Sequence, residues 1–311
     1  MVELNVERAI VGTSLQDGGR KGYLRAGIAP AGAMDWARLA MANQMLENPA
    51  EATVIEVGAS GIALCLNIGQ LQLSFAGPRF SVSIDGIKQY APLRFLLKAG
   101  QCLEIVPQKN AMWGYIGIKG VIQTSLLLGS LSENSASKMI AKKITTGEAL
   151  NIDEQACISP SFQSFIDPFI AYESQAIGIL PAAQYEDFPN EAKQNLVSSP
   201  LMIEPRYNRM AYRLTGIQLE CLTGHDILSD GINMGAIQVP GDGQPFILMA
   251  DHQTTGGYPK IASVCKADLP RLAQMAPNRR FLLKWLTLDE AMLQWSNIRQ
   301  QLQSITPLSG F

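Results

Sequence analysis

The residues best suited to chemistry lie in one polar segment, residues 251–260, with the sequence DHQTTGGYPK. Gly256 and Gly257 allow backbone conformations with positive φ and the close approach of a ligand. Successive backbone N–H groups in such a turn can form a concave site for an anion. The segment is therefore the predicted binding tip, and the alternative is a wide hairpin loop whose polar side chains bond only its own backbone. Hydrogen-bond donors and acceptors come from Asp251, His252, Gln253, Thr254, Thr255 and Tyr258.

Apolar runs on both sides of this tip predict the strands that hold it. Ala236–Val239 and Pro245–Ala250 are short apolar runs, and the sequence GDG at 241–243 between them is a turn signal, so the pair indicates a β-hairpin. A third β-prone run, Ile261–Cys265, follows the tip. We therefore expect the tip to project from buried strands.

Two arginines precede the hairpin on a segment that alternates as a strand does. In RYNRMAYRLTG, residues 206–216, a strand that begins at Arg209 places Arg209 and Arg213 on the face opposite the apolar residues. That face meets either solvent or an anionic ligand. We expect Ile217–Cys221 to form the returning partner strand.

A glycine-rich segment near the start, residues 13–35, has no sustained periodicity. A loop of this length inside a compact domain is uncommon and often functional, which makes Gln16, Asp17 and Arg20 candidates for substrate binding. The alternative pairs Asp17 with Arg20 or Arg25 as a structural clip of small energetic value.

The remaining chain predicts a mainly β protein with few helices. Short β-like runs alternate with turn residues from residue 54 to residue 118, a cadence typical of a closed or sandwich-like antiparallel unit. Helical spacing occurs at Met34–Glu47. A capping box at Thr287–Glu290 opens a terminal helix whose apolar stripe is Leu288, Met292, Trp295, Ile298 and Leu302. Proline and polar residues at 189–200 suggest domains at 1–195 and 196–311.

Composition excludes several classes of partner. The 311 residues carry 25 Lys plus Arg against 27 Asp plus Glu, so no basic excess attracts nucleic acid or an anionic membrane. The five scattered cysteines fit free thiols in a reducing compartment, and the two histidines lack partners at metal-ligand spacing. We expect a cytoplasmic protein with no metal and no membrane span. The common nucleotide, serine-hydrolase and zinc-protease motifs are absent from the sequence.

Three blocks of this chain resemble the allophanate hydrolase subunit 2 family, also called biotin-dependent carboxyltransferase-like proteins, KipA or the C subunit of 5-oxoprolinase. They are TSLQDGGRKGYLRAGIAPAGAMD near the start, RYNRMAYRLTG in the middle, and the long block LSDGINMGAIQVPGDGQPFILMADHQTTGGYPKIASVCKADLPRLAQ. One segment departs from the family: Ser135–Leu150 stands where relatives carry a Gly-rich turn, and only Gly147 and Glu148 keep its ending. The resemblance implies two cyclophilin-like β-barrel domains with peripheral helices, an α+β fold that is mainly β.

The resemblance also implies partners and substrates. A subunit 1 (KipI-like) protein and a third, lactam-utilisation (LamB/YcsF-type) subunit are expected, in an assembly that uses ATP to hydrolyse 5-oxoproline to glutamate. In that reading Asp251, His252 and Gln253 are catalytic, the arginines hold a carboxylate or phosphate, and the tip with Gln238 binds substrate. One alternative is a carboxyltransferase half that uses carboxybiotin to carboxylate urea or another amide. A second is a KipA-type regulator that binds a kinase inhibitor and catalyses nothing.

Overall fold

The computed structural model describes residues 1–159, 161–169, 176–305 and 307. The chain divides into two compact units. The first contains Met1–Arg20, Asp35–Ile170 and Gln300–Phe311, and the second contains Lys21–Met34 and Ala171–Arg299. These bounds differ from the expected division between residues 195 and 196.

The expected junction is occupied by a helix of the second unit. α2 (Asn190–Ser198) packs on β23 (Leu283–Trp285), and the indole Nε1 of Trp285 donates to the carbonyl of Lys193 over 3.2 Å. The proline and polar residues that suggested a linker therefore mark the ends and the outer face of a packed helix. Lys21–Met34 belongs to the second unit although it is early in the sequence.

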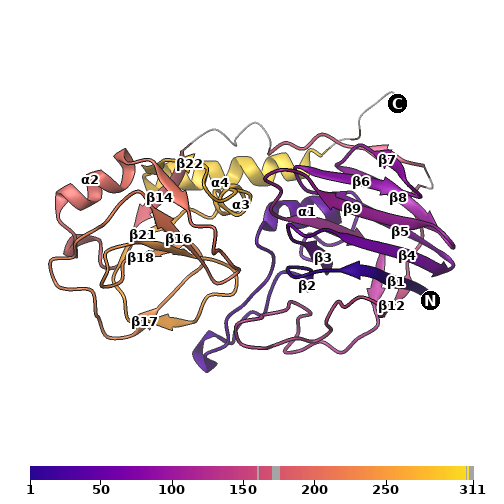
Figure 1. Cartoon of the computed structure of the whole chain (residues 1–311), viewed down its shortest axis with the longest axis horizontal. Coiled ribbons are helices and arrows are strands. Elements are labelled where there is room, and N and C mark those ends of the chain that lie inside the picture. The colour runs from indigo at the N-terminus through magenta and orange to yellow at the C-terminus, as the bar shows by residue number, and fades with distance from the viewer. Residues whose placement is uncertain (160, 170–175, 306, 308–311) are drawn as a thin grey trace. The chain divides into compact units, whose positions relative to one another are not determined.

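The first unit consists of two antiparallel sheets around one apolar core (Figure 1). One sheet has the order β11-β12-β1-β4-β9-β6-β7 and the other has the order β13-β8-β5-β10-β3-β2. Side chains from both, such as Leu64 and Leu73, are fully buried in the same cluster. The strands are β1 (Val2–Ala9), β2 (Ser14–Gln16), β3 (Val54–Val57), β4 (Ile62–Ile68), β5 (Gln70–Ala76), β6 (Phe80–Ile84), β7 (Ile87–Gln89), β8 (Leu93–Lys98), β9 (Cys102–Pro107), β10 (Gly114–Ile118), β11 (Gly120–Ile122), β12 (Ala149–Glu154) and β13 (Gln163–Ser164).

The predicted early helix is confirmed as α1 (Trp36–Gln44), and it packs directly on β10 and β5. Asp35 begins it, because its side chain accepts a hydrogen bond from the backbone N–H of Arg38. The Ser74 hydroxyl donates to the carbonyl of Ala42 over 2.6 Å. A Cβ on Gly117 would lie 2.8 Å from that same carbonyl oxygen, so glycine is what lets the helix approach the sheet.

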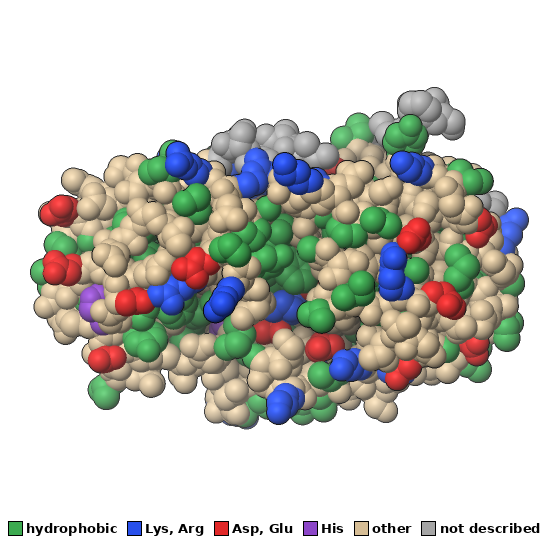
Figure 2. Space-filling view, in the orientation of Figure 1, with side chains coloured by type: hydrophobic (Ala, Val, Ile, Leu, Met, Phe, Trp, Pro, Cys, Tyr) green, Lys and Arg blue, Asp and Glu red, His purple; other side chains and the backbone are tan. Residues whose placement is uncertain are grey.

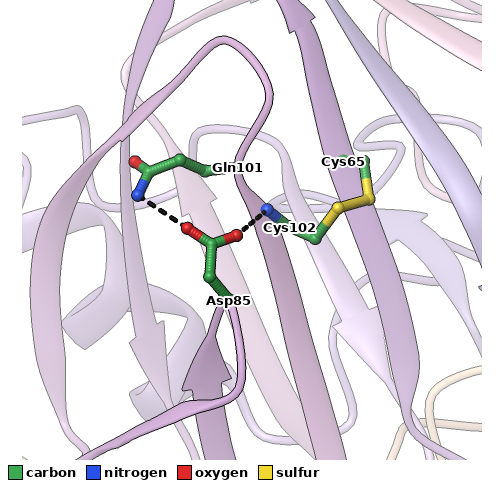
Figure 3. The surroundings of a disulfide bond; sticks show 4 residues. All are labelled: Cys65, Asp85, Gln101 and Cys102. Atoms are coloured by element: carbon green, nitrogen blue, oxygen red, sulfur yellow. Dashed lines mark hydrogen bonds between the residues drawn. A yellow bond between two sulfur atoms is a disulfide. The ribbon is translucent and has the colours of Figure 1, made fainter.

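Two cysteines of the first unit form a disulfide, which corrects the expectation that all five are free thiols. Cys65 and Cys102 are directly opposed on the adjacent antiparallel strands β4 and β9, with Cα atoms 4.1 Å apart (Figure 3). Asp85 accepts hydrogen bonds from the backbone N–H of Cys102 and from Gln101 beside this bridge. Because 37 residues separate the two cysteines, their pairing depends on strand register. Cys157, Cys221 and Cys265 are free.

The second unit is built on an eight-stranded sheet with the order β22-β15-β16-β19-β18-β21-β14-β23. Its neighbouring strands are antiparallel except for the parallel pair of β14 and β23. The fold class is confirmed as mainly β, with a nearly closed barrel sheet. The elements are β14 (Ile177–Pro181), β15 (Leu201–Ile203), β16 (Ala211–Thr215), β17 (Asp230–Gly231), β18 (Ala236–Gln238), β19 (Phe246–Leu248), β20 (Thr255–Gly256), β21 (Lys260–Val264), β22 (Arg280–Phe281), α3 (Leu269–Ala273), and the 3-10 turns η1 (Leu24–Ala26) and η3 (Tyr185–Asp187).

Two strand predictions in the second unit are wrong. The strand expected to begin at Arg209 begins at Ala211, and Ile217–Cys221 forms no strand, since the neighbours of β16 are β15 and β19. The first strand starts two residues later than expected, and β16 pairs with β15, which precedes it, and with β19, instead of with the segment that follows it.

The terminal helix α4 (Leu288–Gln303) begins at the predicted capping box. The backbone N–H of Thr287 donates to Glu290 Oε2 over 2.7 Å, and the N–H of Glu290 donates to Thr287 Oγ1 over 3.2 Å. The predicted apolar stripe is only partly right. Ala291 and Leu302 are buried, whereas Leu288 and Met292 are exposed, so the packed face is rotated from the one that periodicity suggested.

Replacing Thr287 with alanine is expected to lower the free energy of unfolding by about 1 kcal/mol, because it leaves a backbone N–H of the first turn without its acceptor. Urea titration followed by circular dichroism measures the change. Ser296→Ala, at an exposed position in the middle of α4, is the control and should be neutral or slightly stabilising. An equal loss in both variants would show that the cap has no special weight.

Charged side chains of both signs are interspersed over the face of the molecule shown in Figure 2, in keeping with the balanced composition. Within the described residues, no helix is long and apolar enough to cross a membrane. That same part of the chain has no group of three or more His, Cys, Asp or Glu side chains arranged to hold a metal ion.

Candidate functional site

The predicted hairpin below the tip is confirmed. β18 and β19 pair antiparallel with Ile237 opposite Ile247, and β21 lies on the other side of β18. The tip therefore connects two strands that flank a third, rather than two neighbours. This arrangement needs a wide connection, which explains the length of the polar segment.

The tip is held by a second segment, residues 227–232, that local sequence patterns do not connect with it. β20 within the tip pairs with β17 in this segment, with Asp230 opposite Gly256. The N–H of Ile232 donates to the carbonyl of Thr254 over 3.0 Å, and that of Ile227 donates to the carbonyl of Gly257 over 2.8 Å. The tip is thus one half of a short ribbon, with Gln253, Thr255 and Tyr258 exposed on it.

Space rather than backbone conformation favours glycine at position 256. Neither Gly256 nor Gly257 has a positive φ, contrary to the possibility that the sequence suggested. A Cβ on Gly256 would lie 2.5 Å from a methyl carbon of Ile232 and 2.9 Å from Gln238 Nε2. A side chain at this position would force the side chains of Ile232 and Gln238 to shift.

His252 is buried at the start of the tip, and a neighbouring backbone carbonyl fixes the tautomer of its ring. Its Nδ1 lies 2.6 Å from the carbonyl of Gln253, which only accepts, so Nδ1 carries the proton. Nε2 is left as an acceptor, and within the described residues no hydrogen bond to it is made. Burial lowers the pKa of His252 below its ordinary value, against the smaller opposing effects of the Gln253 carbonyl and of Asp251. The ring is a neutral base at neutral pH.

Asp251 and Arg209 form a buried ion pair. Arg209 donates from Nε and Nη2 to the two carboxylate oxygens over 3.1 and 2.9 Å, and Nη2 also donates to the carbonyl of Gly32 over 2.7 Å. The Asp251 side chain is fully buried and that of Arg209 is 10% exposed. Arg209 therefore connects the base of the tip to the early segment Lys21–Met34, a contact that the sequence pattern did not indicate.

Arg213 does not share the environment of Arg209. It pairs with Asp242 and donates from Nε to Gln244 over 3.0 Å, at the turn of the hairpin. The Glu204 carboxylate lies 3.7 Å from the same Nε, and the Arg213 side chain is 43% exposed. Arg213, Asp242 and Glu204 therefore form a solvent-exposed cluster in which one cation faces two carboxylates.

Lys260, the last residue of the tip, is a buried cation that was not among the predicted site residues. It is 4% exposed, and its Nζ donates to Asp230 Oδ2 over 2.7 Å. This bond is the main reason why the pKa of Asp230 is lowered. The backbone N–H of Lys260 donates to Gln184 Oε1 over 3.2 Å. The signal available in the sequence was a lysine at the start of an otherwise apolar strand.

The three early candidates lie in the first unit. Gln16 is fully buried, and its Nε2 donates to Ser14 Oγ and to the carbonyl of Glu133. Asp17 accepts hydrogen bonds from Ser130 and Ser132, and Arg20 donates from Nε to the carbonyl of Leu127 over 3.0 Å. These contacts hold the start of the glycine-rich segment against residues 127–133.

The structure thus brings together the tip, Gln238, Arg209, Asp251 and His252 within the second unit, and it places Gln16, Asp17 and Arg20 in the first. The cations predicted to receive an anion are each bound to a carboxylate of this chain. The groups that the described residues leave unbonded at the base of the tip are acceptors, namely His252 Nε2 and Gln238 Oε1. The arrangement suits proton transfer and hydrogen bonding to a neutral amide better than binding of an anion by these arginines.

The family model for the carboxyltransferase domain, subdomain A and B, matches residues 26–285. The chain belongs to this carboxyltransferase-domain family. It is 31% identical over 300 residues to the C subunit of 5-oxoprolinase from Escherichia coli, covering 93% of each chain. It is 26% identical over 292 residues to the urea amidolyase of Saccharomyces cerevisiae, covering 85% of this chain but only 16% of the yeast protein.

A solved structure agrees with these sequence relatives. The crystal structure of TTHA0988 superposes with a TM-score of 0.82 at 28% identity, covering 92% of this chain and 56% of that one. The chain is therefore close in length to the bacterial 5-oxoprolinase subunit. It corresponds to about half of TTHA0988 and to a small part of urea amidolyase.

Proposed function

We propose that the chain is a subunit of an ATP-dependent 5-oxoprolinase that hydrolyses the cyclic amide of 5-oxoproline to glutamate. The observation that carries this proposal is the similarity to the C subunit of 5-oxoprolinase over 93% of both chains, combined with a neutral, buried histidine at the base of a polar tip. We propose that a KipI-like subunit 1 and a LamB/YcsF-type protein are the other two subunits of the enzyme. A cytoplasmic location is part of the proposal, since the reaction draws on the cellular ATP pool.

His252 has the role of general base in this proposal. Opening a lactam requires a proton to leave the attacking water and another to reach the departing nitrogen. The Nε2 of His252 is the acceptor that the geometry supports, because Nδ1 is bound to the Gln253 carbonyl. ATP, when bound to the complex, supplies the free energy that the stable amide bond demands. Gln253 orients the ring through its backbone, while its exposed side chain remains a candidate substrate contact.

Asp251 and Arg209 are better assigned to positioning than to the roles expected from the sequence. Both carboxylate oxygens of Asp251 accept from Arg209, so the carboxylate is engaged by a fixed cation, which leaves the proton-handling role to His252. Arg209 in turn holds the tip base to Gly32. We propose that Thr254, Thr255 and Tyr258 contact the substrate with the backbone of Gly256 and Gly257. Gln16, Asp17, Arg20 and Arg213 are further candidates for substrate contact in this proposal.

Co-expression with the two partner subunits tests the proposal. The purified complex is expected to release glutamate from 5-oxoproline only when ATP is present, with ADP formed in proportion. Omitting this chain from the co-expression is the control and should abolish turnover. A complete complex that binds ATP yet releases no glutamate would exclude 5-oxoproline hydrolysis.

A carboxyltransferase half is the second candidate, favoured by the family model and by the similarity to urea amidolyase. In that case carboxybiotin on another protein is the carboxyl donor and an amide such as urea the acceptor. Streptavidin blotting of proteins that copurify with the tagged chain separates the two candidates. A biotinylated partner supports carboxyl transfer, and its absence from an active glutamate-releasing complex excludes it.

A further inference from the structure

Gln238 ends β18 directly below the tip, and its carboxamide is completely buried. Nε2 donates to the backbone carbonyl of Tyr258 over 3.2 Å. Because this carbonyl can only accept, the carboxamide must face it with its nitrogen and not its oxygen. Oε1 is therefore fixed on the opposite side, and it is buried without a hydrogen-bond partner in the described part of the chain.

The sequence around Gln238 is arranged to bring this carboxamide close to the tip. The pairing of β18 with β21 shifts register between Ile237 and Gln238, which places Gln238 opposite Lys260. Such irregularities re-aim a side chain and are frequent beside active sites. On the other side, a Cβ at position 256 would lie 2.9 Å from Gln238 Nε2, so the carboxamide would have to move to admit one. The carboxamide thus contacts the tip at both Gly256 and Tyr258.

Gln238 makes one hydrogen bond to the tip and leaves its other polar atom unsatisfied. Burying a carbonyl oxygen without a partner costs free energy on folding, and this cost offsets part of what the bond from Nε2 to the Tyr258 carbonyl contributes. We propose that Gln238 is a positioning residue, whose carboxamide fixes the backbone of Gly256–Tyr258 and thereby the place of Thr254 and Thr255 for substrate. The functional part of this inference rests on the proposed function, whereas the hold on the tip does not.

Hydrogen–deuterium exchange of the full chain tests the hold on the tip without any activity assay. Gln238→Leu is expected to raise exchange of amides 253–258 about tenfold, since it removes the bond that ties the Tyr258 carbonyl to β18, while exchange in β21 stays unchanged. Gln72→Leu is the matched control. Gln72 is 2% exposed in β5 of the first unit, and its Nε2 donates to the carbonyl of Ser159, so its loss should not affect the tip.

Gln238→Glu adds a second measurement, the pH dependence of amide exchange in the tip, which a purely structural role would leave unchanged. An ionised carboxylate repels the Tyr258 carbonyl, whereas a protonated carboxyl donates to it, and burial raises the pKa of such a carboxyl. Tip exchange, corrected for the intrinsic pH dependence, is therefore expected to approach the wild-type value as pH falls in this variant and to stay high in Gln238→Leu. In the assembled complex, kcat of Gln238→Leu should be about tenfold below that of wild type at every pH. The ratio of kcat between Gln238→Glu and wild type should rise toward one as the pH falls.

The two arms separate failure of this inference from failure of the proposed function. Wild-type tip exchange in Gln238→Leu, or exchange raised equally throughout the second unit, overturns the positioning role. If the leucine variant does not fold, a Glu variant with tip exchange that does not change with pH overturns it as well. Locally raised exchange in Gln238→Leu, together with a wild-type complex that hydrolyses no 5-oxoproline, would support the hold of Gln238 on the tip and refute the proposed function.

Discussion

Replacing His252 with glutamine is expected to lower kcat of the assembled complex by about 100- to 10,000-fold, the contribution typical of a positioned general base. The bond from Nδ1 to the Gln253 carbonyl fixes the tautomer of the His252 ring. Nε2 is therefore a proton acceptor at the base of the tip. Glutamine keeps the polarity and much of the volume of the ring but accepts no proton near neutral pH. Steady-state glutamate release measures the effect, and the KM for 5-oxoproline should change much less.

His225→Gln is the matched control for this experiment. His225 also bonds a backbone carbonyl through Nδ1, that of Val239 at 3.1 Å, and it is the only other histidine in the sequence. It should retain near wild-type kcat. Equal losses in the two variants, or a His252 variant with unchanged kcat, would remove His252 from the catalytic step.

The pH dependence of the wild-type complex follows from the same side chain. Burial lowers the pKa of His252, so the neutral form that accepts a proton persists to a lower pH than for an exposed histidine. We expect kcat to be constant with respect to this group above about pH 6.5 and to fall only below that value.

The stability of the protein should also depend on the protonation of His252. The folded state disfavours protonation of the ring, so the contribution of His252 to the free energy of unfolding is complete above the ordinary pKa and is lost as the pH falls toward the lowered pKa of the folded state. His252→Gln should remove this contribution.

Replacing Asp251 with alanine is expected to reduce the free energy of unfolding of the second unit by about 3–5 kcal/mol, because it removes the carboxylate that pairs with the nearly buried guanidinium of Arg209. Two bonds from Arg209 lose their acceptor, and only the bond to the Gly32 carbonyl remains of the three. Urea unfolding followed by tryptophan fluorescence measures this change.

The double variant Arg209→Met with Asp251→Leu separates the cost of a stranded charge from the value of the pair itself. Removing both charges should recover most of the lost stability, since a buried ion pair replaced by apolar side chains is often close to neutral. A double variant as unstable as Asp251→Ala alone would instead show that the pair contributes directly to folding. Activity should stay low in the double variant if the contact to Gly32 positions the tip.

Local elements of this protein could be predicted from its sequence because neighbouring residues set them. The hairpin of β18 and β19 follows from two apolar runs and a Gly-Asp-Gly turn, and the start of α4 follows from Thr287 and Glu290, three residues apart. The polar tip and its histidine were likewise visible as an interruption between strands. The family was evident from the same blocks, and with it the mainly β class.

Only the tertiary structure decided which of these residues meet. Arg209 pairs with Asp251 across 42 positions and with Gly32 across 177, so a residue expected to bind an anion is held by a carboxylate of its own chain. Cys65 and Cys102 face each other because β4 and β9 are neighbours, and Asp17 bonds a serine pair more than 100 residues away. Periodicity records which face of an element is apolar, and it carries no information about which distant element covers that face. The sequence by itself therefore determined the elements and the chemistry available at the tip, whereas long-range pairing decided which of those groups remain available to a substrate.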